Sequence, residues 1–204
     1  MGHLIVKDHG WNKLKADLEK LARGESYVKV GMVGEKAAKV EPEHAAAGGE
    51  PLTNVKLAAI HEFGAPERGI PERSFLRSTF STHRAEYQDL LKKAAAEIMS
   101  GKRKTSIRKM LSAIGFKAKW DVKDAILKGT GIPPPNAQAT IDAKNRKGAW
   151  NKGSKLRDRS GKFSRTGDSS GPRTLVDTTV MVKAIDHAVV ISGEAPEPNA
   201  GEKE

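Results

Sequence analysis

The segment T-S-I-R-K-M-L-S-A-I-G-F-K-A-K-W-D-V-K-D-A-I-L (residues 105–127) predicts a long helix. Its apolar residues recur at intervals of three and four, which places them on one helical face. They are Ile107, Met110, Leu111, Ile114, Ala118, Val122, Ala125 and Ile126. Most of a basic stretch falls on the opposite face. A glycine at position 101 and a proline-rich stop at residues 129–135 bound the segment.

Strands are predicted on both sides of this helix. In residues 27–33, apolar residues alternate with Lys29 and Gly31, the period typical of a half-buried strand. Residues 184–191 contain a run of apolar residues expected to be buried, and residues near 70–80 are expected to supply a third strand. The sequence therefore predicts an α+β fold, a small antiparallel sheet flanked by three or four helices.

The remaining helices follow from the same periodicity. They are expected at residues 11–21, 53–63, about 73 or 82 to 100, and, as a short turn, 177–183. Thr53 is placed to cap the second of these, and residues 34–51, which show no period, are expected to form a loop.

These elements divide the chain into four parts. Residues 1–24 are an N-terminal helix, and residues 25–143 with 174–192 form a single α+β domain. Residues 144–173 form an inserted basic arm or β-hairpin, because their composition cannot pack by itself. Residues 193–204 are an acidic tail that we expect to be disordered.

Composition excludes several kinds of chemistry. The 204 residues include no cysteine, which excludes disulfides, cysteine-ligated zinc, iron–sulfur clusters and thiol catalysis. Only 37% of the residues are hydrophobic, so the core is small and stability from partner subunits is expected. No apolar run approaches the roughly 20 residues that span a bilayer, and we expect the protein to be made and used in the cytosol or in something assembled there.

The net charge of +11 is concentrated in two stretches. Residues 102–128 hold nine basic and two acidic side chains, a net charge of +7, and residues 144–173 hold ten and two, a net charge of +8. Such stretches suit a polyanion-facing surface or an acidic partner. The simpler alternative for either stretch is a solvated charged face.

Enzymatic motifs are weak. Residues 167–172 (G-D-S-S-G-P) resemble the nucleophile motif of chymotrypsin-like proteases, but too few strands are present for two barrels. His61 and Glu62 lack the second histidine of a zincin helix. Glu62, Glu67 and Glu72 straddle a proline- and glycine-rich turn and are not expected to converge as in a nuclease. We therefore expect no catalysis, no cofactor and no metal.

Several short motifs together carry a family resemblance. L-A-A-I-H-E-F-G (residues 57–64) followed by I-P-E-R-S-F-L-R (residues 70–77) resembles the hallmark of bacteriophage tail-completion and neck proteins, a family that includes minor tail protein Z-like proteins. Residues 113–126 are similar to the central helix of that family, Pro135-Asn136 with Thr140 to its P-N-x-x-T segment, and residues 175–178 to its P-L-x-D-T-G signature. Thr179 replaces the glycine of that signature, and residues 145–172 are an insertion.

The resemblance implies a structural virion protein that forms a homo-oligomeric ring where the DNA-filled head meets the tail. Its partners would be other connector, tail-terminator or tail-tube proteins, with non-specific contact to packaged DNA and no membrane. It would be assembled in the host cytoplasm and be located in the virion. The alternative, from a different class, is a basic nucleic-acid-binding accessory protein.

Two groups of residues are candidates for contact. Phe63, Phe75 and Leu76 are expected to form a hydrophobic clasp, with Arg73 and Arg77 beside it and available to a neighbouring subunit's carboxylates. The alternative is that these residues only pin a loop to the core. The interface candidates are Phe63, Arg73, Phe75, Arg77, Trp150 and Phe163.

The second group lies in the basic arm, which we expect to be ordered in the particle against an acidic neighbouring protein or against DNA. The candidates are Lys152, Lys155, Arg157, Arg159, Lys162 and Arg165. Protein contact is the favoured alternative, because Trp150 and Phe163 would anchor in a hydrophobic pocket, whereas DNA binding does not require aromatic residues.

Overall fold

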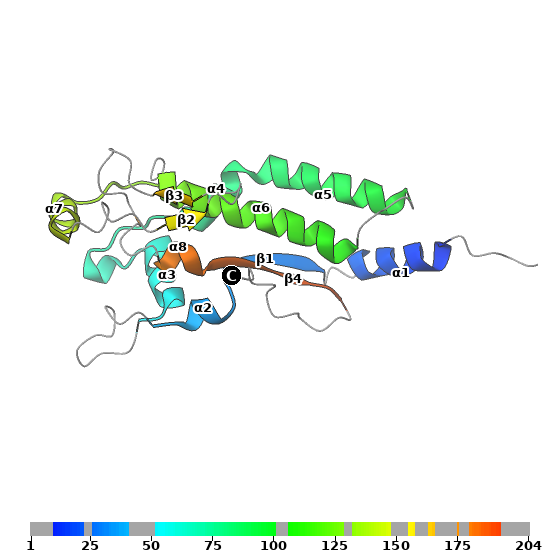
Figure 1. Ribbon diagram of the computed structural model, residues 1–204, viewed down its shortest axis with the longest axis horizontal. Coiled ribbons are helices and arrows are strands. Elements are labelled where there is room, and N and C mark those ends of the chain that lie inside the picture. Colours follow the sequence, from blue (N-terminus) through cyan, green and yellow to red (C-terminus); the bar gives the residue numbers. More distant parts are fainter. Residues whose placement is uncertain are drawn as a thin grey trace, which may run out of the picture.

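The structure is a computed structural model, and it describes residues 10–22, 26–40, 52–100, 106–128, 132–147, 155–157, 163–165, 175 and 180–192 (Figure 1). Its elements are α1 (Trp11–Ala22), β1 (Tyr27–Met32), α2 (Glu35–Ala38), α3 (Asn54–Phe63), the 3-10 helix η2 (Pro66–Arg68), α4 (Phe75–Thr82), α5 (Arg84–Met99), α6 (Ile107–Lys128), α7 (Gln138–Lys147), β2 (Lys155–Arg157), β3 (Phe163–Arg165), α8 (Val180–Ala184) and β4 (Ile185–Val190). The predicted α+β class with a small antiparallel sheet is confirmed.

The sheet pairs the two strands that the sequence placed at residues 27–33 and 184–191. Strands β1 and β4 run antiparallel, in a register from Tyr27 opposite Val190 to Met32 opposite Ile185. The third strand expected near residues 70–80 is wrong, because Phe75 begins helix α4. Within the described residues this sheet has two strands, and its stability depends on the helices packed against it.

Helix α6 covers one face of this sheet. It packs against both strands, and α5 and α4 pack against α6 in turn, so that the helices and the sheet form layers (Figure 1). Gly115 permits the close approach, since a Cβ there would lie 2.6 Å from His187 Cδ2 and 2.7 Å from Val28 Cγ1. The long helix predicted at residues 105–127 therefore packs against both strands and buries one face of the sheet.

The interior consists of two hydrophobic clusters along α6. The larger joins α3, α4, α6, α8 and β4 through Ala58, Phe75, Val122, Ile126, Ile132, Met181, Val182 and Ile185. The smaller lies at the other end of the sheet and contains Ile98, Ile107, Leu111 and Ile191. No described helix is both long enough and apolar enough to cross a membrane.

Several boundaries differ from the sequence prediction. The segment 34–51, expected to be a loop, contains the short helix α2. Of the two starts expected for the long helix that ends near residue 100, about 73 and 82, the structure agrees with the second, because α5 begins at Arg84 and α4 is a separate helix. Helix α7 was not predicted; it ends at Lys147, inside the range given to the basic arm. Helix α8 begins at Val180, and the predicted start at 177 lies outside the described residues.

Two local predictions are confirmed. The Thr53 side chain accepts a hydrogen bond from the Lys56 amide and so caps α3. The basic arm contains an antiparallel hairpin, formed by β2 and β3.

Candidate functional site

Glu62 links the two halves of the motif at residues 57–64 and 70–77. Its side chain is buried at the end of α3 and faces the first turn of α4, whose amide groups have no partner within the helix. The carboxylate accepts hydrogen bonds from the amides of Leu76 (2.9 Å) and Arg77 (3.0 Å) and from the Ser74 hydroxyl (2.8 Å). Glu62 therefore caps α4 from a neighbouring helix.

The electrostatics of Glu62 agree with this role. Burial alone would raise the pKa of Glu62, but the hydrogen bonds from the Leu76 and Arg77 amides, from Ser74 and from the Arg77 guanidinium outweigh it and hold that pKa below its usual range. The charged form is thus the one that the fold requires. Glu62 and Glu72 both bind Arg77 rather than converging on a cation site.

Arg77 and Phe63 form the exposed part of this motif. The Arg77 guanidinium lies 5.0 Å from the centroid of the Phe63 ring, and its nitrogens donate to Glu62 Oε1, to the Glu62 carbonyl and to Glu72 Oε1. The Phe63 residue is 64% exposed. A rigid arginine stacked on an exposed aromatic ring is a surface of the kind enriched at protein interfaces.

The other two interface candidates of this motif have roles within the chain. The Arg73 Nε donates to the Pro134 carbonyl at 3.0 Å, and a second guanidinium nitrogen donates to the Pro135 carbonyl at 3.3 Å. Phe75 has no exposed surface and lies in the larger core cluster. Phe63 and Arg77 are thus in contact at the surface, whereas Arg73 is held by the Pro134 and Pro135 carbonyls and Phe75 lies in the core.

Lys117, one of the nine basic residues of the first basic stretch, is paired with carboxylates within the fold. The Lys117 ammonium lies 2.9 Å from a Glu86 carboxylate oxygen and 2.8 Å from one of Asp121, which also accepts a hydrogen bond from the Tyr87 hydroxyl. Burial alone would lower the pKa of Lys117, but these carboxylates raise it overall. Burial and the hydrogen bond to Asp121 raise the pKa of Tyr87. The expectation that α6 presents this charge outward is wrong for Lys117.

The same cluster contains three side chains of metal-ligand type. Donor atoms of His83, Glu86 and Asp121 lie within 4.8 Å of one another. However, the Lys117 ammonium binds both carboxylates and supplies the positive charge that a metal ion would bring. The arrangement is therefore an ion-pair cluster that joins α5 to α6.

Lys119 has a similar internal role on the other side of α6. It is 6% exposed and its ammonium lies 3.2 Å from Asp186 Oδ1 on β4. Burial alone would raise the pKa of Asp186, but hydrogen bonds from His187 and the Lys119 charge hold that pKa well below its usual range. The i, i+4 spacing of Lys117 and Asp121 is visible in the sequence; the partner of Lys119 is not, because it lies 67 residues away.

Ser112, His187 and Asp186 resemble a hydrolase triad in their contacts alone. Ser112 Oγ lies 3.1 Å from His187 Nε2, and His187 Nδ1 lies 3.5 Å from Asp186 Oδ1. The histidine is packed between α6 and β4, where even a Cβ on Gly115 would collide with its ring. A substrate would have to enter this contact between helix and sheet, so the three residues hold α6 on the sheet.

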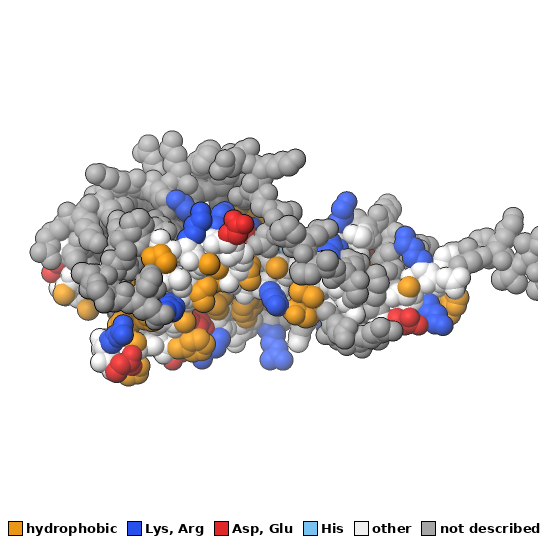
Figure 2. All heavy atoms as spheres, turned by 90° about the horizontal axis from the view of Figure 1, so that it is seen from below, with side chains coloured by type: hydrophobic (Ala, Val, Ile, Leu, Met, Phe, Trp, Pro, Cys, Tyr) orange, Lys and Arg blue, Asp and Glu red, His pale blue; other side chains and the backbone are white. Residues whose placement is uncertain are grey.

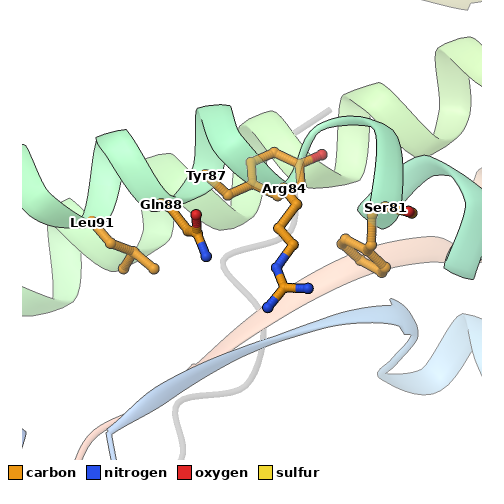
Figure 3. A pocket seen from close by; sticks show the side chains of 6 residues that line it. Ser81, Arg84, Tyr87, Gln88 and Leu91 are labelled. Carbon is orange, nitrogen blue, oxygen red and sulfur yellow. The ribbon is translucent and has the colours of Figure 1, made fainter.

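A groove lies along the junction of α4 and α5 (Figure 3). It encloses about 450 Å³ and is lined by Phe80, Ser81, Arg84, Tyr87, Gln88 and Leu91. The lining is mainly apolar, and Arg84, Gln88 and Leu91 follow one another along one side of α5. No pattern in the sequence predicts this groove, because it depends on the break between the two helices at His83.

The basic arm is described at two strands. Lys155 and Arg157 lie in β2, and Phe163 and Arg165 lie in β3. Lys155 is opposite Arg165, Leu156 opposite Ser164, and Arg157 opposite Phe163. The other candidates, Trp150, Lys152, Arg159 and Lys162, lie outside the described residues.

Comparisons with protein-family models, with curated proteins and with solved structures found no match to this chain.

Proposed function

We propose that the protein is a structural virion component of the phage neck or tail-completion type, which forms a ring at the head–tail junction. The observation that carries this proposal is the convergence of the segments behind the family resemblance. Ala58, Phe75, Val122 and Ile126 from three of them are members of one core cluster, and Leu175 from a fourth packs against it. Motifs far apart in the sequence thus form one structural unit, as a shared family domain would require.

A ring also needs apolar surface that a neighbouring subunit can cover. Seen from the side of the sheet, hydrophobic side chains gather over the sheet and over the end of the molecule that contains α3 (Figure 2). Exposed large side chains include Tyr27, Val55, Phe63, Leu91, Met99 and Phe116. We assign the contact between subunits to the exposed Phe63–Arg77 pair, whose guanidinium is already fixed by Glu62 and Glu72.

In this role the chain would catalyse no reaction, bind no cofactor or metal, and contact no membrane. The partners would be further copies of the same chain and neighbouring connector, tail-terminator or tail-tube proteins. The site of action would be the virion, after assembly in the host cytoplasm.

A matched pair of variants tests the assignment. Phe63→Ser removes the exposed ring of the motif, and Met99→Ser removes a comparably exposed side chain (67% against 64%) from the end of α5. Native mass spectrometry should show a closed oligomer for the wild type and for Met99→Ser, and monomers for Phe63→Ser, whose circular dichroism spectrum should remain that of the folded chain. An oligomer that survives Phe63→Ser would contradict the assignment.

The hairpin favours a second candidate, a basic accessory protein that binds nucleic acid. Lys155 and Arg165 occupy directly opposite positions, and Arg157 lies two residues from Lys155. Salt-sensitive DNA binding by a monomer would support this candidate, whereas a ring of fixed stoichiometry that co-purifies with tail or connector subunits would support the first.

A further inference from the structure

The contacts of β4 show which of its backbone groups point out of the sheet. In an antiparallel pair, every second residue exchanges hydrogen bonds with the partner strand, and the residues between direct their N–H and C=O groups outward. The His187 amide donates to Asp186 Oδ1 at 2.8 Å, and the Val189 carbonyl accepts from the Arg108 guanidinium at 3.3 Å. Neither partner lies on β1, so positions 187 and 189 belong to the outward set.

The outer edge of β4 is closed by charged side chains. The Asp186 carboxylate that accepts from the His187 amide is itself bound by the Lys119 ammonium at 3.2 Å. Arg108, which binds the Val189 carbonyl, lies about three turns before Lys119 and therefore on the same side of α6. Charged side chains on an edge strand are a common means of preventing another strand from pairing with it.

The outer edge of β1 is open. Val30 is opposite His187 and Val28 is opposite Val189, so these two valines carry the outward backbone groups of β1. Among the residues that the structure describes, their outward amides and carbonyls have no hydrogen-bond partner. An edge of this kind is a template on which an extended segment can add as a further strand.

The two faces of β1 define which strand would fit. Val28 packs against the smaller hydrophobic cluster under α6, and Val30, two residues on, shares its face. Lys29 belongs to the other face, where its ammonium lies 5.5 Å from the centroid of the Tyr27 ring. A matching strand of three residues therefore needs apolar side chains at its first and third positions, beside the two valines.

Residues 4–6 have this composition. Leu4, Ile5 and Val6 form a run of apolar residues between His3 and Lys7, and isoleucine and valine are among the residues that favour strands. They lie outside the described residues. Leu4 and Val6 would lie beside the two valines of β1, and Ile5 beside the lysine between them.

The position of α1 excludes this pairing within one copy. Helix α1 is about 18 Å long, and β1 begins beyond its far end and runs away from it (Figure 1). The stretch from Ile5 to Gly10 spans at most about 18 Å when fully extended. To reach Val28 and Val30 of its own chain, the segment would have to cover the whole of α1 and part of β1 as well. The strand must therefore come from another copy.

We propose that residues 4–6 of one copy add as an antiparallel third strand to the open edge of β1 in the next copy. The inference rests on the proposed function, since the next copy is the neighbouring subunit of the ring. Donor and acceptor are different surfaces of the chain. Such a contact is heterologous, and its repetition closes a ring rather than a two-fold dimer.

A matched pair of proline variants tests the acceptor strand. Val28 and Val189 are directly opposite and both pack against the smaller cluster, but the first belongs to the open edge and the second to the closed edge. Proline removes one outward amide in each and no hydrogen bond of the ladder. In native mass spectrometry of the full chain, Val28→Pro should raise the concentration at which the oligomer dissociates by about tenfold or more, whereas Val189→Pro should leave it unchanged. Equal behaviour of the two variants would overturn the inference.

Cysteine pairs test the donor segment without depending on the proline variants, because the chain contains no cysteine. Lys29 would occupy a non-hydrogen-bonded position of the added pair, where Cα atoms are about 4.5 Å apart and a disulfide fits. After oxidation, Ile5→Cys with Lys29→Cys should give covalent multimers on non-reducing gels. The control is Ile5→Cys with Ala188→Cys, since Ala188 is opposite Lys29 but on the closed strand, and it should remain monomeric on the gel.

Three gel results would overturn the inference. A disulfide within a single chain would show that the segment pairs with its own β1. Covalent dimers of Lys29→Cys alone would show that two β1 edges pair with each other. Multimers of the Ala188→Cys control in equal amount would show that the contact is not specific to the open edge.

Ring formation separates this inference from the proposed function. A closed ring without disulfides between positions 5 and 29 would overturn the inference alone. Copies that are joined through these positions but do not close into a ring would overturn the ring proposal alone.

Discussion

The two basic stretches, residues 102–128 and 144–173, carry net charges of +7 and +8 but hold them in different ways. In the first, α6 lies between α5 and the sheet, and Lys117 and Lys119 are paired with carboxylates of α5, α6 and β4. In the second, the register of the described strands puts position 155 opposite position 165, both of them basic residues. Net charge along a sequence therefore does not locate a binding surface until the internal partners are known.

The largest expected effect on stability concerns the hydrophobic core that packs around α6. Phe75→Ala should lower the free energy of unfolding by about 3–5 kcal/mol, because Phe75 is completely buried in the larger cluster. Phe163→Ala, in the hairpin, should change it by less than about 0.5 kcal/mol. Urea unfolding of both variants checks this contrast, and equal losses would mean that the hairpin belongs to the core.

Asp186→Ala should have the next largest effect. It leaves the buried Lys119 ammonium without its carboxylate, which should cost about 3 kcal/mol. Lys119→Met removes the charge itself and should be much milder, since its methylene chain can still pack. Denaturant unfolding at pH 7 measures both, and the idea of internal neutralisation fails if Asp186→Ala is as stable as wild type.

Gly115→Ala tests the close contact of α6 with the sheet. Alanine favours a helix by about 1 kcal/mol over glycine, so an isolated helix would gain stability. Here the added Cβ would collide with His187 and Val28, and we expect a net loss of about 1–3 kcal/mol. A higher melting temperature in the variant would show that α6 is not pressed against the sheet.

Acid should lower the free energy of unfolding, because Glu62 and Asp186 become protonated. The pKa of each is lowered in the fold from ordinary values of 4.5 and 3.8, so the unfolded chain takes up protons first as the pH falls. Their stabilising contribution is complete above about pH 5 and is lost as the pH falls through the folded pKa values. Unfolding measured from pH 7 to pH 3 should show this decline, and Glu62→Gln should flatten part of it.

The smallest expected effect is that of the hairpin cations on stability. Lys155→Gln, Arg157→Gln and Arg165→Gln together should leave the melting temperature within a few degrees of wild type, or raise it slightly, because a repulsive pair is removed. A marked loss of stability, measured by thermal unfolding followed by circular dichroism, would show that these side chains have partners in the rest of the fold.

Local signals predicted much of this fold. The cap at Thr53, the periodicity of α6 and the alternation in β1 depend on residues close together in the sequence, and the structure has all three. The third strand was wrong because the start of α4 is fixed by Glu62, which lies 12 to 15 residues before its hydrogen-bond donors. No glycine or proline marks the break at His83, so the sequence does not distinguish a helix start near residue 73 from one near residue 82, and it does not predict the separate helix α4.

In the candidate site, too, contacts between residues close in the sequence were predicted and contacts with distant residues were not. Phe63 and Arg77 are expected to lie together because the motif is short, and they are in contact. The role of Arg73 depends on distant partners, the Pro134 and Pro135 carbonyls, which hold it from more than 60 residues away. The internal pairing of Lys119 could not be predicted for the same reason.

Electron cryomicroscopy of the particle that carries this protein tests the central claim most directly. The account predicts a closed ring of the chain at the head–tail junction, with α6 inside the ring wall. A junction without the chain, or a ring in which α6 faces the DNA, would contradict it.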